Sequence, residues 1–199
     1  DPLIMATVRD SFQPYAYRCE KLGFDKTHIR QIDDTFTAQA FITTDLDDNQ
    51  ITAFHPGAMN FSHHNSVKEV KHVSLGIVAP DGRDGMIVHA REFQECGIPF
   101  IFDPGQGLPM FSGDELVDFI SKADYVTVND YEAELLLERT GYSLGKLASL
   151  VKALIVTKGA QGSVIYTGGH HIEIPSVQPK AIVDPTGCGD AYRAGLLYG

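Results

Sequence analysis

Cysteine is scarce in this chain, whose 199 residues include three, at Cys19, Cys96 and Cys188. Their number is odd, their positions are scattered, and no two of them form a C-x-x-C pair. A disulfide scaffold and a structural zinc site are therefore not expected. Unpaired cysteines are typical of a reducing compartment, so we expect a cytoplasmic protein.

Basic residues are also few, with 16 Lys and Arg against 26 Asp and Glu and a formal net charge of -10. A nucleic-acid partner would need a basic surface, so this balance argues against one. It does not argue against a phosphate-handling enzyme, because backbone N–H groups and a metal ion can hold the phosphates of a nucleotide. No apolar run approaches the ~20 residues of a membrane span, and no secretory leader is visible, so no membrane partner is expected.

What remains is the composition of a globular domain, with 43% hydrophobic and 21% charged residues. A chain of this length can form one domain with a substantial core. It begins at Asp1 without an initiating Met and ends at Gly199, partway through an expected helix. We therefore expect flanking segments beyond both ends, so that the α/β core would be truncated on both sides.

Strands and helices alternate from about residue 73 onward, after a helix over 12–22 and a short strand over 29–32. The later pattern predicts strands over 73–78, 99–102, 125–128, 153–156, 163–166 and 171–174, and helices over 83–95, 112–123 and 130–139 and from residue 187. Short connections predict right-handed crossovers, and hence an α/β fold with a parallel sheet sandwiched by helices. Ligands bind at the carboxyl ends of such strands, where Asp103, Asn129 and Thr157 are expected.

Residues 33–56 interrupt this alternation. The segments 37–44 and 50–55 are rich in Thr, Phe and Ile, and a turn cluster over 45–49 separates them. Their chemistry predicts a β-hairpin. We interpret residues 33–56 as a small β lid over the ligand edge, and residues 1–32 and 57–199 as the α/β core.

A glycine-rich segment opens the last expected helix, with the sequence Asp184-Pro185-Thr186-Gly187-Cys188-Gly189-Asp190. Glycines let the backbone approach a ligand closely, and the free N–H groups of a first helical turn attract an anion. A carboxylate in that turn, Asp190, is well placed to take a proton from an attacking hydroxyl. The same residues would also be explained by a glycine-rich turn in which Asp190 only begins the helix.

The same segment resembles the signature of the ribokinase-like (PfkB) family of sugar and nucleoside kinases, which has an Asp, then Thr-Gly-small-Gly-Asp, then a helix with small residues. The resemblance implies an ATP-dependent phosphotransferase in which Asp190 is the catalytic base. It also implies that Gly187, Cys188 and Gly189 form an anion hole for the transferring phosphoryl group. Cys188 departs from the more usual Ala, but its contribution would be its backbone N–H.

Two further stretches match motifs of this family and occur in the same order along the chain. Residues 129–132 resemble its Asn-x-x-Glu motif, and residues 157–162 resemble its Thr-x-Gly-x-x-Gly stretch, although a helix start and a β-turn would explain them locally. The resemblance implies ATP and Mg²⁺, the metal being bound through water by Glu132, and it leaves a potassium ion at Asp184 and Thr186 open. The nucleotide-binding residues that it implies are Asn129, Glu132, Thr157, Gly159, Gly162 and Thr186.

The expected hairpin resembles the lid of the bacterial adenosine kinases of this family. In that branch lid aromatics pack on the adenine ring, a role that Phe54 and Phe41 could fill, unless both pack the hairpin against the core. Adenosine would then be phosphorylated on its ribose 5′-hydroxyl to give AMP. Ribose, fructose or another sugar stays open as the acceptor. Lids in the family sometimes pair between subunits, which leaves a homodimer through the hairpin open.

Two other classes compete with a kinase. A helix N-terminus favours a reactive thiolate, so Cys188 could serve a cysteine-nucleophile hydrolase, but no His or Asn partner is identifiable. The other class is a non-catalytic ligand-binding relative, such as a regulator. The His63-His64 and His170-His171 pairs do not suggest a metal site, because adjacent side chains of a strand point to opposite faces. We expect these histidines in exposed loops or strands.

Overall fold

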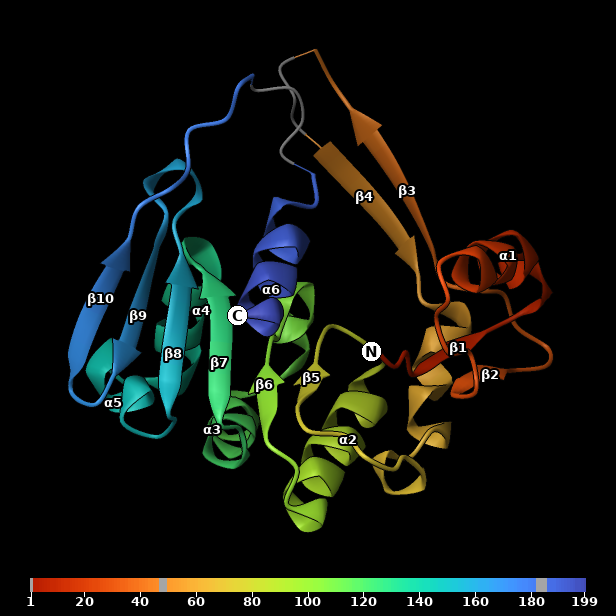
Figure 1. The fold of residues 1–199 in the computed structure, drawn as a ribbon, viewed down its shortest axis with the longest axis horizontal. Coiled ribbons are helices and arrows are strands. Elements are labelled where there is room, and N and C mark those ends of the chain that lie inside the picture. Colours follow the sequence, from red (N-terminus) through yellow and green to blue (C-terminus); the bar gives the residue numbers. More distant parts are fainter. Residues whose placement is uncertain (1, 47–49, 182–185) are drawn as a thin grey trace.

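The computed structural model describes residues 2–46, 50–181 and 186–199. Its largest element is a six-stranded sheet with the strand order β10-β9-β8-β7-β6-β5 (Figure 1). Strands β5 to β8 are parallel, whereas β9 runs antiparallel to β8 and β10 antiparallel to β9. The strands are β5 (Gly76–Val78), β6 (Phe100–Phe102), β7 (Tyr125–Asn129), β8 (Ala153–Thr157), β9 (Ser163–Thr167) and β10 (His170–Ile174).

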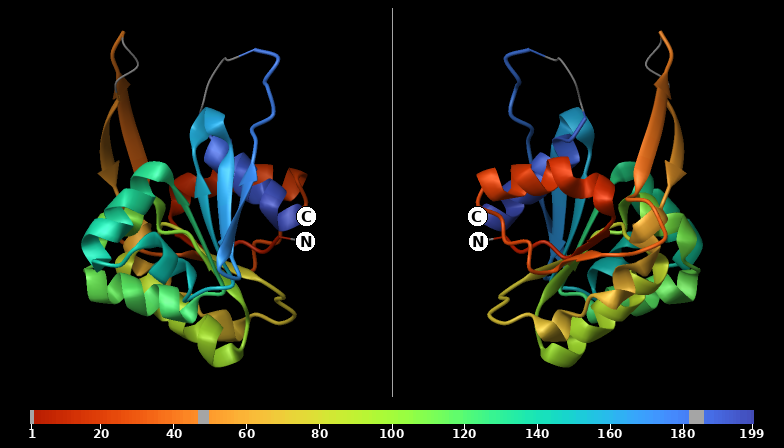
Figure 2. Two further views of the ribbon diagram at one scale, coloured as in Figure 1. Left: turned by 90° about the vertical axis from the view of Figure 1, so that its left-hand side faces the viewer. Right: turned by 90° about the vertical axis from the view of Figure 1, so that its right-hand side faces the viewer.

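Helices lie on both faces of this sheet, as expected, but in unequal number (Figure 2). The crossovers between the parallel strands all advance in one direction, and right-handed crossovers of that kind place their helices on the same face. This face carries α2 (Arg83–Cys96), α3 (Gly113–Lys122) and α4 (Asp130–Thr140), while α6 (Cys188–Tyr198) lies across the other. The short α5 (Leu144–Ala148) precedes β8. None of the helices within the described ranges combines the length and apolar character that crossing a membrane requires.

Local sequence signals account for the ends of these helices. Gly97 and Gly141 end α2 and α4 with φ of 66° and 67°, a left-handed conformation that glycine adopts without steric cost. Ser112 and Glu115 form a capping box at the start of α3, each side chain accepting a hydrogen bond from the backbone N–H of the other residue. These caps fix where each helix leaves the sheet.

The core lies between the sheet and the helices α2, α3 and α4. Phe102 of β6 stacks on Phe119 of α3 with ring centroids 4.6 Å apart, and Phe93 of α2 stacks on Phe100. Large side chains here are almost completely buried, among them Phe100, Phe102, Phe111, Met86, Leu116 and Ile120. Burial of this kind stabilises the fold by about 1.5–3 kcal/mol for each large apolar side chain.

The N-terminal part contains a two-stranded sheet of its own. Strands β1 (Ala6–Val8) and β2 (Ile29–Gln31) form a parallel pair outside the main sheet, connected by α1 (Gln13–Lys21). β1 contacts the segment η2 (Gly57–His64), because Thr7 Oγ1 donates a hydrogen bond to the carbonyl of Ala58 at 2.7 Å.

The hairpin is formed by β3 (Gln39–Thr44) and β4 (Gln50–His55), which pair antiparallel. It projects from the molecule on the side toward which the carboxyl ends of β6, β7 and β8 point (Figure 1). Part of the expected turn cluster, residues 47–49, lies outside the described residues.

Three expectations need correction. The sheet is mixed, because β9 and β10 continue it antiparallel after β8. The first strand of the sheet begins at Gly76 rather than at residue 73, since its partner β6 begins at Phe100 and the register pairs these two residues. His63 and His64 lie in a 3-10 helix rather than in a loop or strand, and their ring centroids are 4.7 Å apart in an edge-on arrangement.

Candidate active site

The first turn of α6 has the form that an anion-binding site needs. Gly187 precedes the helix with φ of 80°, a left-handed conformation that side-chain-bearing residues rarely adopt. Gly189 and Asp190 lie in the first turn, where backbone N–H groups have no partner within the helix. Residues 186–190 are exposed. Free amides, the positive end of the helix dipole and a carboxylate therefore meet at one accessible place.

Two side chains of α6 fix this turn against the sheet. The hydroxyl of Tyr192 donates to Ser163 Oγ at 2.9 Å, at the start of β9. The guanidinium of Arg193 donates through Nη2 to Asp103 Oδ1 at 2.6 Å, and its Nε pairs with Oδ2 of the same carboxylate. Asp103 directly follows β6, so both contacts hold α6 at the edge where the parallel strands end.

The other predicted residues meet at this edge. Asn129 and Thr157 are register partners at the ends of β7 and β8. Asn129 Oδ1 accepts from the backbone N–H of Glu132 at 2.7 Å, while Glu132 Oε2 accepts from the N–H of Asn129 at 2.8 Å. The Asn-x-x-Glu stretch is thus a second capping box, and it places the Glu132 carboxylate beside the strand ends.

The acidic side chains at this edge influence one another. Burial raises the pKa of Asp103, and the negative charge of Asp190 adds to this effect while Arg193 opposes it. Burial also raises the pKa of Glu132; the N–H of Asn129 and the charge of Arg193 oppose the rise, and the charge of Asp103 adds to it. Three carboxylates thus share the field of the Arg193 guanidinium.

The turn after β8 contains the other two predicted glycines. Gly159 has φ of 53° and open space where a Cβ would project. Gly162 has φ of 89°, and a Cβ there would come within 2.0 Å of the Ile174 carbonyl oxygen at the end of β10. Gly162 is therefore required by chain packing, whatever else it contacts, whereas Gly159 leaves its surface free for a ligand.

Phe41 and Phe54 lie on opposite faces of the hairpin. The register pairs Phe41 with Ala53 and Phe54 with Ala40, and neighbouring residues of a strand point to opposite sides. Both side chains are more than half exposed. A ligand on one face of the hairpin can therefore meet only one of the two rings, and stacking on a base by Phe54 or Phe41 stays a prediction.

Comparison with known proteins identifies the family. The model of the pfkB family carbohydrate kinases matches residues 11–199. The chain belongs to the pfkB family. Its fold is accordingly ribokinase-like, a mixed α/β sheet with a small antiparallel sheet beside it.

Members of the pfkB family with high similarity include nucleoside kinases. The structure of Burkholderia thailandensis nucleoside kinase in complex with inosine matches with a TM-score of 0.95 at 51% identity, over 99% of this chain and 65% of that chain. The same enzyme in complex with ADP-inosine matches with a TM-score of 0.94. A nucleoside kinase of Methanocaldococcus jannaschii is 36% identical over 165 residues, which are 81% of this chain and 53% of that protein. The chain thus spans about half to two thirds of the length of these relatives.

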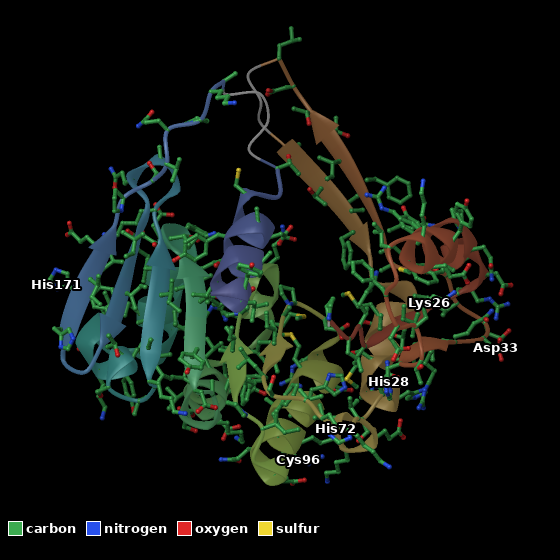
Figure 3. All side chains as sticks on the ribbon, in the orientation of Figure 1. Lys26, His28, Asp33, His72, Cys96 and His171 are labelled. Carbon is green, nitrogen blue, oxygen red and sulfur yellow. The ribbon has the colours of Figure 1, made fainter. Side chains whose placement is uncertain are left out.

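Not every predicted residue of the pfkB motif can be placed. Asp184 lies outside the described residues. Thr186 is described and exposed, directly before Gly187. Cys188 is exposed at the start of α6, and a cysteine nucleophile needs an adjacent base. The labelled His28, His72 and His171 lie on other elements, away from α6, and do not supply one (Figure 3).

Arg193 and Tyr192 also belong to this pfkB-type site, although neither was predicted from the sequence. Their helical positions are informative in retrospect, because Arg193 follows Asp190 by three residues and so lies on the same face of α6. Asp103 was expected at the sheet edge, but its partner could not be inferred, since 90 residues separate the two.

Proposed function

We propose that the protein is an ATP-dependent nucleoside kinase that phosphorylates the ribose 5′-hydroxyl group. The observation that carries the proposal is the position of the first turn of α6. Gly187, Gly189 and Asp190 lie at the carboxyl edge of the sheet, beside Glu132 and the ends of β7 and β8. The named activity of the similar nucleoside kinases supports the acceptor class.

In the proposed reaction the Asp190 carboxylate accepts the proton of the attacking hydroxyl. The hydroxyl oxygen forms a bond to the γ-phosphorus of ATP, and the bond from that phosphorus to the bridging oxygen of ADP breaks. Backbone N–H groups at residues 187–190 stabilise the negative charge on the transferring group.

Mg²⁺ bound to the nucleotide would neutralise part of the phosphate charge. Glu132 fits an outer-sphere role, because its cap uses Oε2 and leaves Oε1 for a water molecule of the hydrated ion. Asn129, Thr157, Thr186 and Gly159 would line the nucleotide site, with Gly162 shaping the turn. A potassium site at Asp184 and Thr186 is part of the proposal and would appear as activity that requires K⁺.

Residues 33–56 would act as the lid, with one hairpin face toward the nucleoside. Both faces carry exposed apolar side chains, Ile42 and Phe54 on one and Phe41 and Ile51 on the other. The second face could therefore pair with another copy of the chain as a homodimer. The three free cysteines support the reducing, cytoplasmic setting expected from the sequence.

A substrate panel tests the proposal. The whole protein is incubated with ATP and Mg²⁺ and with adenosine, inosine, ribose or fructose in turn, and ADP release is measured. Turnover of adenosine or inosine that is abolished in Asp190→Asn supports a nucleoside kinase. The relative rates with the two nucleosides show whether adenine or hypoxanthine is preferred. Turnover of ribose or fructose alone indicates a sugar kinase. Tight ligand binding without turnover indicates a regulator, and activity lost in Cys188→Ala but kept in Asp190→Asn indicates a hydrolase.

A further inference from the structure

Arg193 connects the buried edge of the sheet with the first turn of α6. Two of its nitrogens pair with Asp103, whose side chain is only 4% exposed. The third, Nη1, lies beside Gly189, since a Cβ at Gly189 would come within 2.6 Å of it. Side chains of a helix point back toward its N-terminus, which explains how Arg193 reaches a residue four positions earlier.

The guanidinium also lies within a group of acidic side chains. The carboxylates whose charges act on it come from three elements: Asp103 after β6, Glu132 in α4 and Asp190 in α6. The hydroxyl of Thr127 in β7 is the uncharged polar neighbour of Asp103. Without a cation here, these carboxylates would repel the anion that the first turn of α6 is built to hold.

We propose that Arg193, fixed by Asp103, is a positioning residue of the phosphotransferase site. It holds the Gly189 amide and the Asp190 carboxylate in place, and it offsets the negative charge of the strand ends. The inference rests on the proposed function, because it assigns Arg193 a part in stabilising a transferring phosphoryl group. Arg193 acts through its neighbours and is not assigned a contact with the substrate.

The test compares a ground-state ligand with a mimic of the transferring group. In the whole protein with Mg²⁺ and inosine, calorimetry measures the binding of ADP alone and of ADP with aluminium fluoride, which resembles the planar phosphoryl group. We expect Arg193→Gln to lose at least about tenfold in affinity for the aluminium fluoride complex. Its affinity for ADP alone should stay within about twofold. Arg193→Lys, which keeps the charge but not the two-point pair, should lie between Arg193→Gln and the wild type.

The matched control is Arg83→Gln. Arg83 also pairs with a carboxylate, that of Glu115 at the start of α3. Both affinities should be unchanged in this variant, and thermal unfolding verifies that each variant is folded. The proposal is overturned if Arg193→Gln binds the aluminium fluoride complex like the wild type, or if it loses affinity for ADP alone to the same extent. A wild type that binds both ligands but turns over no acceptor would contradict the proposed function and leave this measurement valid.

Discussion

Asn129 and Glu132 cap the N-terminus of α4 reciprocally, each side chain accepting a hydrogen bond from the backbone N–H of the other residue. The residue proposed to act on Mg²⁺ therefore has a structural duty as well. Ser112 and Glu115 make the same arrangement at the start of α3. The Ser112–Glu115 capping box can therefore serve as the control for substitutions at Glu132, because it has the same hydrogen bonds but no proposed part in the reaction.

Glu132→Gln should separate the two duties. The amide oxygen can still accept the capping bond, so the free energy of unfolding should change by less than about 1 kcal/mol. Removal of the charge should lower kcat at least about tenfold and raise the Mg²⁺ concentration needed for half-maximal velocity. Initial rates across a Mg²⁺ titration measure both, with Glu115→Gln expected to match the wild type. An unchanged Mg²⁺ dependence in Glu132→Gln would contradict the assignment.

Asp190→Asn should abolish most of the turnover while preserving nucleotide binding. An amide cannot accept the hydroxyl proton, and the loss of a general base costs about 10²–10⁴-fold in rate. Steady-state ADP release and the shift of the melting temperature by ADP give the two readouts. Asp114→Asn, in the exposed first turn of α3, is the matched control. Retained turnover in Asp190→Asn would remove the proposed base.

Gly189→Ala should impair the site through a contact rather than through backbone strain. The added methyl group would lie 2.6 Å from Arg193 Nη1, so the guanidinium must move. We expect kcat to fall about tenfold, as when one stabilising donor of an anion hole is displaced. Gly145→Ala is the control, since its Cβ would meet nothing within 4 Å and alanine favours the helix by about 0.5–1 kcal/mol. Equal activities of the two variants would refute this reading of Gly189.

Phe41→Ala and Phe54→Ala should have different effects, because the two rings lie on opposite faces of the hairpin. Loss of the ring that stacks on a base should weaken nucleoside binding by about 1–3 kcal/mol. This corresponds to a rise in KM of roughly 5-fold to 150-fold. Loss of the other should leave KM unchanged and alter, if anything, the association state. Kinetics and analytical ultracentrifugation of both variants distinguish the faces. A similar rise of KM in both would mean that the lid does not act through base stacking.

Asp81 offers a test of stability against pH. Burial raises its pKa above the ordinary 3.8, although the Gly82 N–H opposes this. The folded state then holds the proton more tightly than the unfolded state, so the contribution of Asp81 to stability decreases as pH rises from about 3.8 through the raised pKa. Asp81→Asn should therefore compare more favourably with the wild type at pH 7 than at pH 3.5, measured as urea midpoints. The reverse order would show that its ionised form is the stabilised one.

Much of the fold follows from local signals in the sequence. Gly97, Gly141 and the Ser112–Glu115 box mark helix ends because each acts within one turn of chain, and the helices predicted over 83–95, 112–123 and 130–139 are confirmed to within one residue at each end. The strand-end positions of Asp103, Asn129 and Thr157 were likewise confirmed, since a parallel alternation fixes the edge at which strands finish.

What the sequence could not provide depends on pairing between distant segments. The start of β5 is set by the first residue of β6, so residues 73–75 look like a strand but have no ladder partner. The faces of Phe41 and Phe54 follow from a hairpin register that composition does not specify. The choice of Asp103 as the partner of Arg193 is a tertiary event for which neither residue carries a local signal.

The two anchors of α6 are consecutive residues, and consecutive helical side chains project about 100° apart. One is bonded to the start of β9 and the other to the end of β6. Together they fix the rotational angle of the helix about its own axis, which neither bond could do alone. The direction in which the Asp190 carboxylate points is therefore set by Tyr192 and Arg193, and a substitution at either position would reorient the proposed base without any change to the glycine-rich turn itself.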